Sequence, residues 1–368
     1  EISLLTCQPR QNVYSLYGHT AIRIQNHCSD AGMGADIAVN YGMFSFRKPY
    51  FVLRFVFGLT DYEIGIETFD EFRPEYERVG CGVLQQELNL NRDEKLALLQ
   101  AIDENYRPEN RVYRYNFFYD NCTTRARDII IRCIKGTVKY PSDDKKSSFR
   151  EMIHGYNSDH PWARFGNDLL LGVKADLATN QEQQQFLPKN LSDDFANAVI
   201  VDSDGTVRRL VTSTTWALQP GTQTVKSEFP LSPTSCATIL SVLILSVCVA
   251  DWKQKRISVW FDTLLLAADG LAGIILFAML FSQHPTVSLN LQIFLLNPLN
   301  IVFLYPTIRD MRKSKANKWL TIWLICICLF FAGTILQHYA DGMLIVASSL
   351  LVRTLLIKKI TNAQTSAR

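Results

Sequence analysis

The chain has 368 residues, enough for two domains, and 48% of them are hydrophobic. Its formal net charge of +3 is small, so charge gives no indication of nucleic-acid binding. Residues up to about 226 mix charged, polar and apolar side chains, whereas the remainder consists of long apolar runs separated by short polar loops. We therefore expect an outer domain over residues 1–226 and a transmembrane domain over residues 227–368.

The first candidate functional residue is His19, in the segment 14–25. Ile22 and Ile24 alternate with Ala21 and Arg23, a pattern that predicts a half-buried strand. His19 lies on the face opposite the two isoleucines, so its imidazole points away from the main apolar face. A histidine in this position is either a structural residue or a general base.

A second strand is expected over residues 36–44, with Ile37, Val39 and Tyr41 on one face. Asn40 lies on the other face and is the best candidate to orient the imidazole of His19, as a third polar group usually does in such sites. Tyr17 and Asn116 are alternatives. The aromatic and basic stretch 44–57 that follows is either a core strand pair or a surface that dips into the bilayer interface.

The strongest catalytic candidate is Cys122. Residues 113–118 are expected to form a strand, Asp120 and Asn121 a turn with helix-capping side chains, and the residues after them a helix. Cys122 would then lie in the first helical turn, where free N–H groups and the helix dipole stabilise a thiolate. The alternative is a buried or disulfide-bonded cysteine.

The count of cysteines bears on that alternative. The outer domain has an odd number of them, namely Cys7, Cys28, Cys81, Cys122 and Cys133. In an oxidising compartment an odd number leaves at least one free thiol, and Cys122 has the best reason to be that one. The sequence does not determine how the other four pair. It contains no CxxC, HExxH, P-loop or GxGxxG motif, so neither a metal nor another cofactor is expected.

Five apolar segments have the roughly 17–25 residues needed to span a bilayer. They cover about residues 229–250, 257–281, 289–308, 319–336 and 339–357. Arg353 lies within the last segment, near its end, where an arginine can reach the headgroups. Lysine and arginine cluster in the loops 251–256 and 309–318 and in the C-terminal tail, whereas the loops 283–288 and 337–341 have none.

This distribution predicts the topology. Basic loops remain in the cytoplasm, so an odd number of spans with a cytoplasmic C-terminus places the outer domain outside the cytoplasm. Because no N-terminal signal peptide is visible in the sequence, we expect that a signal was removed.

Polar residues inside the apolar segments are candidates for function because their burial is unfavourable. Asp262 and Asp269 are seven residues apart on the second span, and they either carry a function or pair within the membrane and hold helices together. His284, at the outer end of that span, contacts lipid headgroups or caps the membrane interface. A transporter or sensor would depend on the two aspartates.

Several motifs together resemble the Lnb-type bacterial lipoprotein N-acyltransferases over nearly the whole chain. They are the sequences at residues 14–24, 40–44, 115–125 and 161–172 in the outer part, and 282–285 and 297–298 in the apolar part. The order of histidine before cysteine, with an Asn-Cys helix start, also resembles the circularly permuted NlpC/P60 (papain-like) thiol fold. The resemblance implies an α+β outer domain of that fold with added helices, followed by an all-α domain of five transmembrane helices.

The resemblance also implies a reaction. A fatty acyl chain would pass from a membrane phospholipid, the acyl donor, to the α-amino group of a diacylglyceryl-cysteine lipoprotein, the acceptor. Cys122 would be the nucleophile and His19 the base, with Asn40 as third member; the expected substrate contacts are Arg125, Asn121, Tyr17, Tyr119 and His284. The expected location is the bacterial inner membrane, with the catalytic domain in the periplasm. The same cysteine and histidine would also serve a membrane-anchored amidase or peptidase acting on the cell wall.

Overall fold

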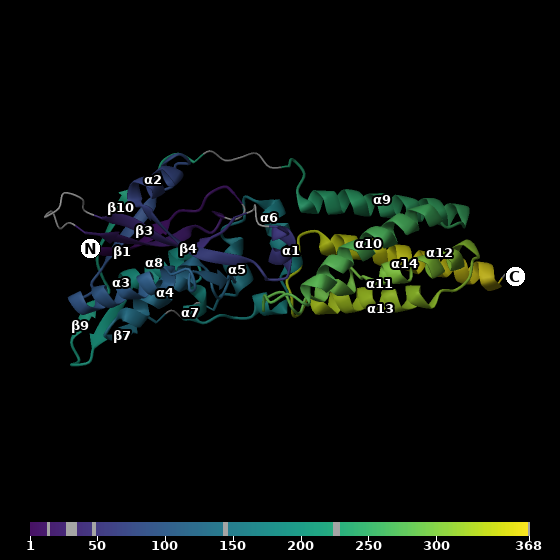
Figure 1. The fold of residues 1–368 in the computed structure, drawn as a ribbon. Helices are drawn as coiled ribbons and strands as arrows, with labels where there is room; N and C mark the ends of the chain where they lie inside the picture. The colour runs from purple at the N-terminus through teal and green to yellow at the C-terminus, as the bar shows by residue number, and fades with distance from the viewer. Residues whose placement is uncertain (13–14, 27–34, 46–48, 143–145, 224–228, 367–368) are drawn as a thin grey trace. The chain divides into compact units, whose positions relative to one another are not determined.

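The computed structural model describes residues 1–12, 15–26, 35–45, 49–142, 146–223 and 229–366 (Figure 1). The chain divides into two compact units. The first contains Glu1–Tyr156 and Ala178–Lys226, and the second contains Asn157–Leu177 and Ser227–Arg368. The segment 157–177, expected in the outer domain, thus packs within the second unit.

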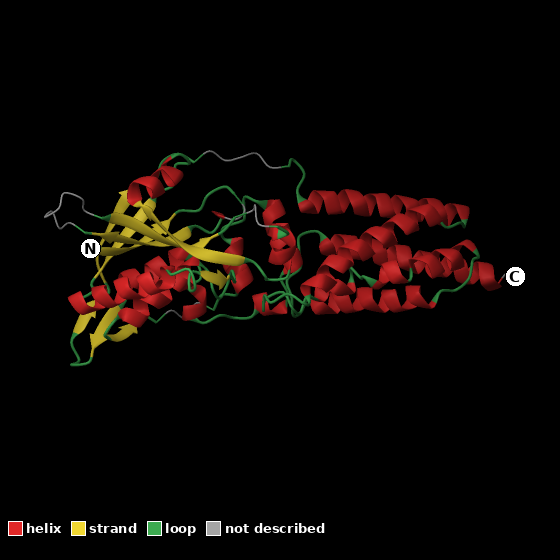
Figure 2. Cartoon of the chain, in the orientation of Figure 1, coloured by secondary structure: helices red, strands yellow, loops and turns green. Residues whose placement is uncertain are grey.

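The first unit is built on an antiparallel sheet of seven strands (Figure 2). The strand order is β10-β5-β1-β2-β3-β4-β6. The strands are β1 (Ile2–Cys7), β2 (His19–Gln25), β3 (Asp36–Met43), β4 (Asp61–Thr68), β5 (Val83–Leu88), β6 (Val112–Arg114) and β10 (Val211–Leu218). The strands β2 and β3 confirm two of the expected elements, whereas the strand expected over residues 113–118 is short because Asn116 and Asp120 pair in a tight turn.

Helices cover both faces of this sheet (Figure 1). The helix α2 (Phe69–Glu77) packs on one face; α3 (Arg92–Tyr106), α4 (Cys122–Cys133) and α8 (Pro188–Asn197) pack on the other. The shorter helices are α1 (Phe51–Val56), α5 (Phe149–His154) and α7 (Gln181–Gln184). The stretch 44–57 thus includes a helix, so its interpretation as a strand pair is wrong; residues 46–48 lie outside the described part.

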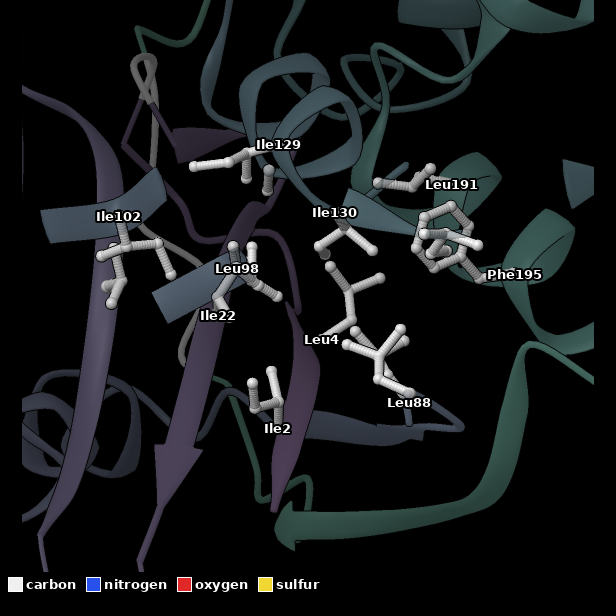
Figure 3. Packing of buried hydrophobic residues seen from close by; sticks show 14 of the residues in the cluster. Ile2, Leu4, Ile22, Leu88, Leu98, Ile102, Ile129, Ile130, Leu191 and Phe195 are labelled. Carbon is white, nitrogen blue, oxygen red and sulfur yellow. The ribbon is translucent and has the colours of Figure 1, made fainter. Parts of the chain in front are cut away.

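The main core lies between the sheet and the helices α3, α4 and α8 (Figure 3). Leu4 and Ile22, on neighbouring strands, are fully buried against Leu98, Ile130 and Phe195 of these helices. The period-two alternation of β2 therefore directs the isoleucines toward α4 and leaves His19 on the opposite face. This packing holds α4 against β2.

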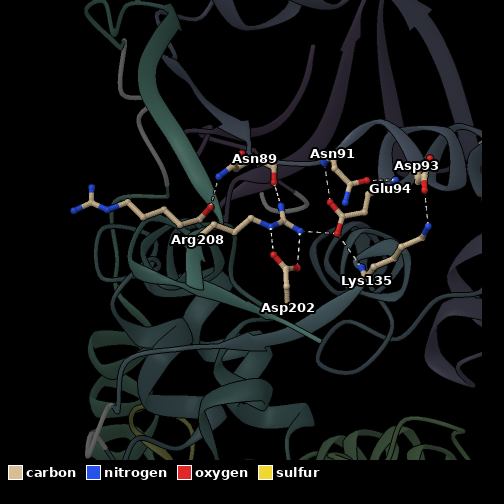
Figure 4. Close-up of polar contacts among 8 residues, drawn as sticks. Asn89, Asn91, Asp93, Glu94, Lys135, Asp202 and Arg208 are labelled. Atoms are coloured by element: carbon tan, nitrogen blue, oxygen red, sulfur yellow. Dashed lines mark hydrogen bonds and ion pairs between the residues drawn. The ribbon is translucent and has the colours of Figure 1, made fainter. Parts of the chain in front are cut away.

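A small three-stranded sheet of β7 (Gly136–Lys139), β8 (Val199–Asp202) and β9 (Val207–Arg209) joins the first unit through a polar network (Figure 4). The Arg208 guanidinium contacts the carboxylates of Asp202, 3.0 Å away, and Glu94, 2.6 Å away. The fully buried Glu94 also accepts hydrogen bonds from the backbone N–H groups of Asn91 and Lys135. Every contact pairs a charge with a donor or an opposite charge, which makes the burial of Glu94 tolerable.

The second unit is helical. Its helices are α6 (Pro161–Leu170), α9 (Pro233–Gln254), α10 (Val259–Met279), α11 (Leu299–Val302), α12 (Leu304–Arg312), α13 (Lys318–Gly333) and α14 (Met343–Ser366), with 3-10 turns at Val173–Asp176 and Leu291–Phe294. Within the described residues, α9 and α10 are long and apolar enough to cross a membrane, and α13 is a shorter apolar helix.

The third expected span, residues 289–308, is not one helix. Leu291–Val302 and Leu304–Arg312 meet at a bend of 75°. The segment is also interrupted before this bend, because Pro298 separates the 3-10 turn Leu291–Phe294 from α11 and removes a backbone N–H donor. Instead, the Asp269 carboxylate accepts from the Asn297 backbone N–H at 3.1 Å and from the Asn300 side chain at 2.5 Å, so the freed polar groups find partners inside the bundle.

Arg353 does not reach toward headgroups as expected. Its side chain is buried and pairs with Asp251 and Asp262, each at 2.7 Å. The contact with Asp262 uses two parallel hydrogen bonds, the geometry that best suits a guanidinium and a carboxylate. This contact joins α14 to α10, so for Asp262 the interpretation as a helix-holding residue fits the structure.

Candidate active site

Cys122 is the first residue of α4, and Asn121 determines where that helix starts. The Asn121 side-chain oxygen accepts hydrogen bonds from the backbone N–H groups of Thr123 and Thr124, both at 2.9 Å. The Thr124 hydroxyl accepts in turn from the Asn121 N–H, which completes a capping box. The Cys122 side chain, partly exposed, thereby lies at the positive end of the helix dipole.

His19 is the first residue of β2 and follows a sharp turn at Gly18. Gly18 has a φ of +81°, and a Cβ on it would lie 2.6 Å from the backbone oxygen of Cys7, so only glycine fits there. One residue beyond His19, the Thr20 hydroxyl is 3.1 Å from the Thr123 hydroxyl. This contact joins the start of β2 to the first turn of α4, and it brings His19 and Cys122 within hydrogen-bonding reach.

A chain of hydrogen bonds orients the imidazole. The His19 Nε2 atom is 2.9 Å from Asn40 Oδ1, and the Asn40 amide nitrogen donates to Glu67 at 2.7 Å. Because Glu67 takes the amide N–H, the Asn40 oxygen faces His19 and can only accept. Nε2 therefore carries the proton, and Nδ1 is left for Cys122.

The electrostatics of the pair favour its charged form. Burial acts to raise the pKa of Cys122, but the charge and hydrogen bond of His19, together with the Thr20 N–H and the Thr123 hydroxyl, lower it overall. Burial acts to lower the pKa of His19, but the Cys122 charge and the hydrogen bonds with Cys122 and Asn40 raise it. The two shifts have opposite signs, which is how a thiolate–imidazolium pair forms near neutral pH.

The strand β3 makes room for the thiol. The register between β3 and β4 shifts between Asn40 and Met43, and Gly42 in this bulge has a φ of +86°. A Cβ on Gly42 would lie 3.4 Å from the Cβ of Cys122 and 3.8 Å from the Tyr113 hydroxyl. A larger residue would thus be strained in its backbone and would fill the space beside Cys122.

Two expected substrate contacts already have protein partners. Arg125 forms two hydrogen bonds with Asp120, at 2.6 and 2.9 Å, so a lipid phosphate would have to compete with this carboxylate. The same pairing neutralises Asp120 beside the Cys122 thiolate. Asn121 uses its side-chain oxygen on the helix start and its amide on two backbone oxygens, so it has a structural role.

The other expected contacts lie at different places. Tyr17 packs edge to face on Phe117, with ring centroids 4.9 Å apart. Tyr119 is exposed and its ring meets Phe149. His284 belongs to the second unit, in the turn that follows α10.

The described cysteines of the first unit, Cys7, Cys81, Cys122 and Cys133, are all free thiols. Cys28 lies outside the described residues. Burial raises the pKa of Cys7, Cys81 and Cys133, so among these four thiols Cys122 alone combines a lowered pKa with a neighbouring imidazole. Within the described part of the chain, no group of three His, Cys, Asp or Glu residues could hold a metal ion.

Glu67 is part of the site, although no pattern in the sequence indicated it. It lies on β4, opposite Ala38 and two pairs along the strands from Asn40. A strand with alternating charged residues is typical of a solvent-facing surface. Only the pairing of β3 with β4 indicates that this carboxylate meets the Asn40 amide.

Fold and site together define a membrane protein in which an α+β domain holds a thiol–imidazole pair. Residues 1–151 match the family model of the Lnb N-terminal periplasmic domain, and residues 224–365 match that of the Lnb transmembrane domain. The chain therefore belongs to the Lnb family and has a periplasmic N-terminal domain followed by a helical transmembrane region. No curated protein and no solved structure gave a match.

Proposed function

We propose that this protein is a lipoprotein N-acyltransferase that uses Cys122 as its nucleophile. It takes a fatty acyl chain from a membrane phospholipid and transfers it to the α-amino group of a lipidated N-terminal cysteine. The observation that carries the proposal is the connected series Cys122, His19, Asn40 and Glu67, in which a thiol of lowered pKa faces an oriented imidazole. Membership of the Lnb family is consistent with processing of membrane lipoproteins.

The reaction has two halves. In the first, the Cys122 thiolate attacks the ester carbonyl, the S–C bond forms, and the C–O bond to the glycerol breaks as the His19 imidazolium gives its proton to the leaving alkoxide. In the second, the lipoprotein amine attacks the thioester and gives a proton to neutral His19. The N–C bond forms, the S–C bond breaks, and the thiolate–imidazolium pair is restored.

Exposed apolar side chains on the first unit support a lipid substrate. The helix α1, which follows β3, exposes the large apolar side chains Leu53 and Phe55, and Tyr50 before it is 78% exposed. Exposed apolar groups of this kind favour contact with lipid. The basic loops favour a cytoplasmic C-terminus, and the bacterial inner membrane as the location is part of this proposal. A permuted NlpC/P60-like arrangement of the first unit is part of this proposal.

The test uses the full chain, purified and placed in phospholipid vesicles. An acyl thioester on Cys122 should form with phospholipid alone and should be released by neutral hydroxylamine. Adding a diacylglyceryl-cysteine peptide should then give an N-acylated peptide, detected by mass spectrometry. Cys122→Ala should abolish both products, whereas Cys133→Ala, a change of the cysteine at the other end of the same helix, should retain both.

The outcomes separate this function from its alternatives. If Cys122→Ala retains acyl transfer, the nucleophile is another group. If wild-type protein forms no thioester with phospholipid but cleaves cell-wall peptides, the same thiol serves an amidase or peptidase. A transporter or sensor is less favoured because the ion pair with Arg353 already accounts for Asp262.

A further inference from the structure

Beside Cys122 lies a buried hydroxyl that the proposed steps do not use. Tyr113, on β6, is 8% exposed. Its hydroxyl oxygen is buried, and no group among the described residues forms a hydrogen bond with it. A buried phenol O–H nearly always has a partner, because leaving it without one is unfavourable. Such an exception indicates a place where a ligand atom completes the bonding.

The position of this hydroxyl is well defined. The Arg125 guanidinium stacks on the Tyr113 ring, 3.5 Å from its centroid, and Arg125 is itself held by two bonds to Asp120. The Tyr41 ring also packs on it, with centroids 6.5 Å apart and the ring planes at 67°. These neighbours hold the ring, and with it the hydroxyl oxygen, in one place, which is what a preorganised donor requires.

The Tyr113 hydroxyl oxygen and Cys122 both lie next to Gly42. The Tyr113 hydroxyl and the Cys122 Cβ both lie within 3.8 Å of one point, the place where a side chain of Gly42 would begin. Because residue 42 is a glycine, it places no side chain between them. A carbonyl carbon bonded to the Cys122 sulfur would bring its oxygen into this space.

The hydroxyl stays protonated and can donate. Burial, and then the negative charge of the Cys122 thiolate, raises the pKa of Tyr113 well above its usual value. By contrast, the N–H groups of Thr123 and Thr124 at the helix start already donate to Asn121. These two donors are therefore not available to a substrate oxygen.

We infer that the Tyr113 hydroxyl is the side-chain donor that stabilises the oxyanion formed when an acyl carbonyl is attacked at Cys122. When the S–C bond forms, the carbonyl π pair moves onto the oxygen, and the Tyr113 O–H donates a hydrogen bond to it. When the C–O bond of the donor breaks, that pair returns and the carbonyl forms again. The same donor serves the second attack, by the amine. The inference rests on the proposed acyl transfer for its natural substrates, but only on Cys122 acylation for its test.

The test compares Tyr113→Phe with Tyr41→Phe in the full chain. Acylation of Cys122 is measured both with phospholipid and with a small activated ester such as p-nitrophenyl butyrate. Tyr113→Phe should slow both reactions by about 10²–10³-fold, the usual effect of losing one oxyanion donor, mainly in kcat. Tyr41→Phe, which loses a hydroxyl bonded to Asn105 at 3.0 Å, should acylate at nearly the wild-type rate.

Two further measurements exclude a structural effect. Tyr113→Phe should alkylate with iodoacetamide at the wild-type rate and with the same pH profile, because Cys122 and His19 are unchanged. Its melting temperature should not fall, because the lost hydroxyl has no protein partner among the described residues, whereas that of Tyr41→Phe should fall. Placing 4-aminophenylalanine at position 113 retains a donor on the same ring and should restore much of the rate.

The results decide the two proposals separately. If Tyr113→Phe is acylated by the activated ester as fast as wild type, the oxyanion role is wrong, whatever happens with phospholipid. If Tyr113→Phe slows that reaction but wild-type protein never accepts acyl groups from phospholipid, the oxyanion role holds and the acyltransferase proposal fails. If Tyr113→Phe slows acylation and iodoacetamide alkylation by the same factor, the change acts on the thiol itself, and the oxyanion role is wrong.

Discussion

The two units of this protein each hold buried charges, and they do so in opposite ways. In the first unit, Cys122 and His19 are both groups that can gain and lose a proton; His19 lowers the pKa of Cys122, Cys122 raises that of His19, and the thiol is partly exposed. In the second, Arg353 is permanently charged and lies fully enclosed between Asp251 and Asp262. The first arrangement can change its charge during a reaction, whereas the second can only hold helices in place.

The largest expected effect comes from breaking the pair of Cys122 and His19. His19→Ala should reduce thioester formation by about 10³–10⁴-fold, because both the base for the thiol and the acid for the leaving group are lost. The pH midpoint of Cys122 alkylation should also move upward, since burial then raises the pKa without opposition from the imidazole. If the pH profile of Cys122 alkylation is the same as in wild type, His19 does not act on Cys122.

Breaking the ion pairs of Arg353 with Asp251 and Asp262 should affect the stability of the protein, not the reactivity of Cys122. Arg353→Met leaves two buried carboxylates without a cation, which should cost about 3–5 kcal/mol. The melting temperature of the purified chain in detergent should fall markedly, while the protein that remains folded should alkylate at Cys122 normally. Adding Asp251→Asn and Asp262→Asn should recover much of the loss, and failure to recover it would contradict a purely electrostatic role.

A smaller effect is expected where the imidazole is oriented. Asn40→Ala removes a hydrogen bond to a charged group, worth about 1.5–3 kcal/mol, so activity should fall about 10- to 100-fold. The double variant with His19→Ala should be hardly worse than His19→Ala alone, because both act through one ring. If the two losses multiply, Asn40 acts on the substrate instead.

Glu67 should show a still smaller and more selective effect. Glu67→Ala should cost a few-fold in activity, less than Asn40→Ala, because it only sets the direction of the Asn40 amide. Glu67→Gln keeps an oxygen that can accept from that amide and should behave nearly as wild type. Equal losses in the two variants, measured as the rate of thioester formation, would indicate that the negative charge matters and not the orientation.

The mildest change concerns the break in the apolar segment. Asp269→Asn keeps an oxygen that can accept from the Asn297 N–H and the Asn300 side chain. It should therefore alter stability by no more than about 1 kcal/mol, seen as a small shift in melting temperature. Asp269→Ala should lower it further, and an equal effect of both variants would mean that the charge itself is required.

The sequence predicted those parts of the site that depend on local patterns. The alternation around His19 and the capping residues before Cys122 act within a few residues, so both the strand and the helix start could be anticipated. Glu67 and Tyr113 reach the site only through the pairing of β4 with β3 and β6. That pairing joins segments far apart in the chain, and no local pattern shows which side chains it brings together.

Prediction from the sequence was limited in the same way for the apolar half of the chain. Hydropathy located the apolar segments that form α9 and α10, but it does not detect the interruption and bend in the third expected span, because a few polar residues and one proline change little in a long apolar run. It also predicted a headgroup position for Arg353, since the partners Asp251 and Asp262 lie on other helices. Composition therefore predicts which segments are apolar, and tertiary contacts decide how their polar residues are used.

The assignment of residues 157–177 to the second unit has a practical consequence for protein production. The chain leaves the first unit after Tyr156 and returns to it at Ala178. In between, Phe165 and Leu169 of α6 pack in the apolar core of the second unit, and the Asn290 and Gln292 side chains bond to the backbone at the end of α6. A truncated protein ending at residue 226 would expose these apolar groups to water and should aggregate, whereas replacing residues 157–177 with a short polar linker should give a soluble catalytic fragment.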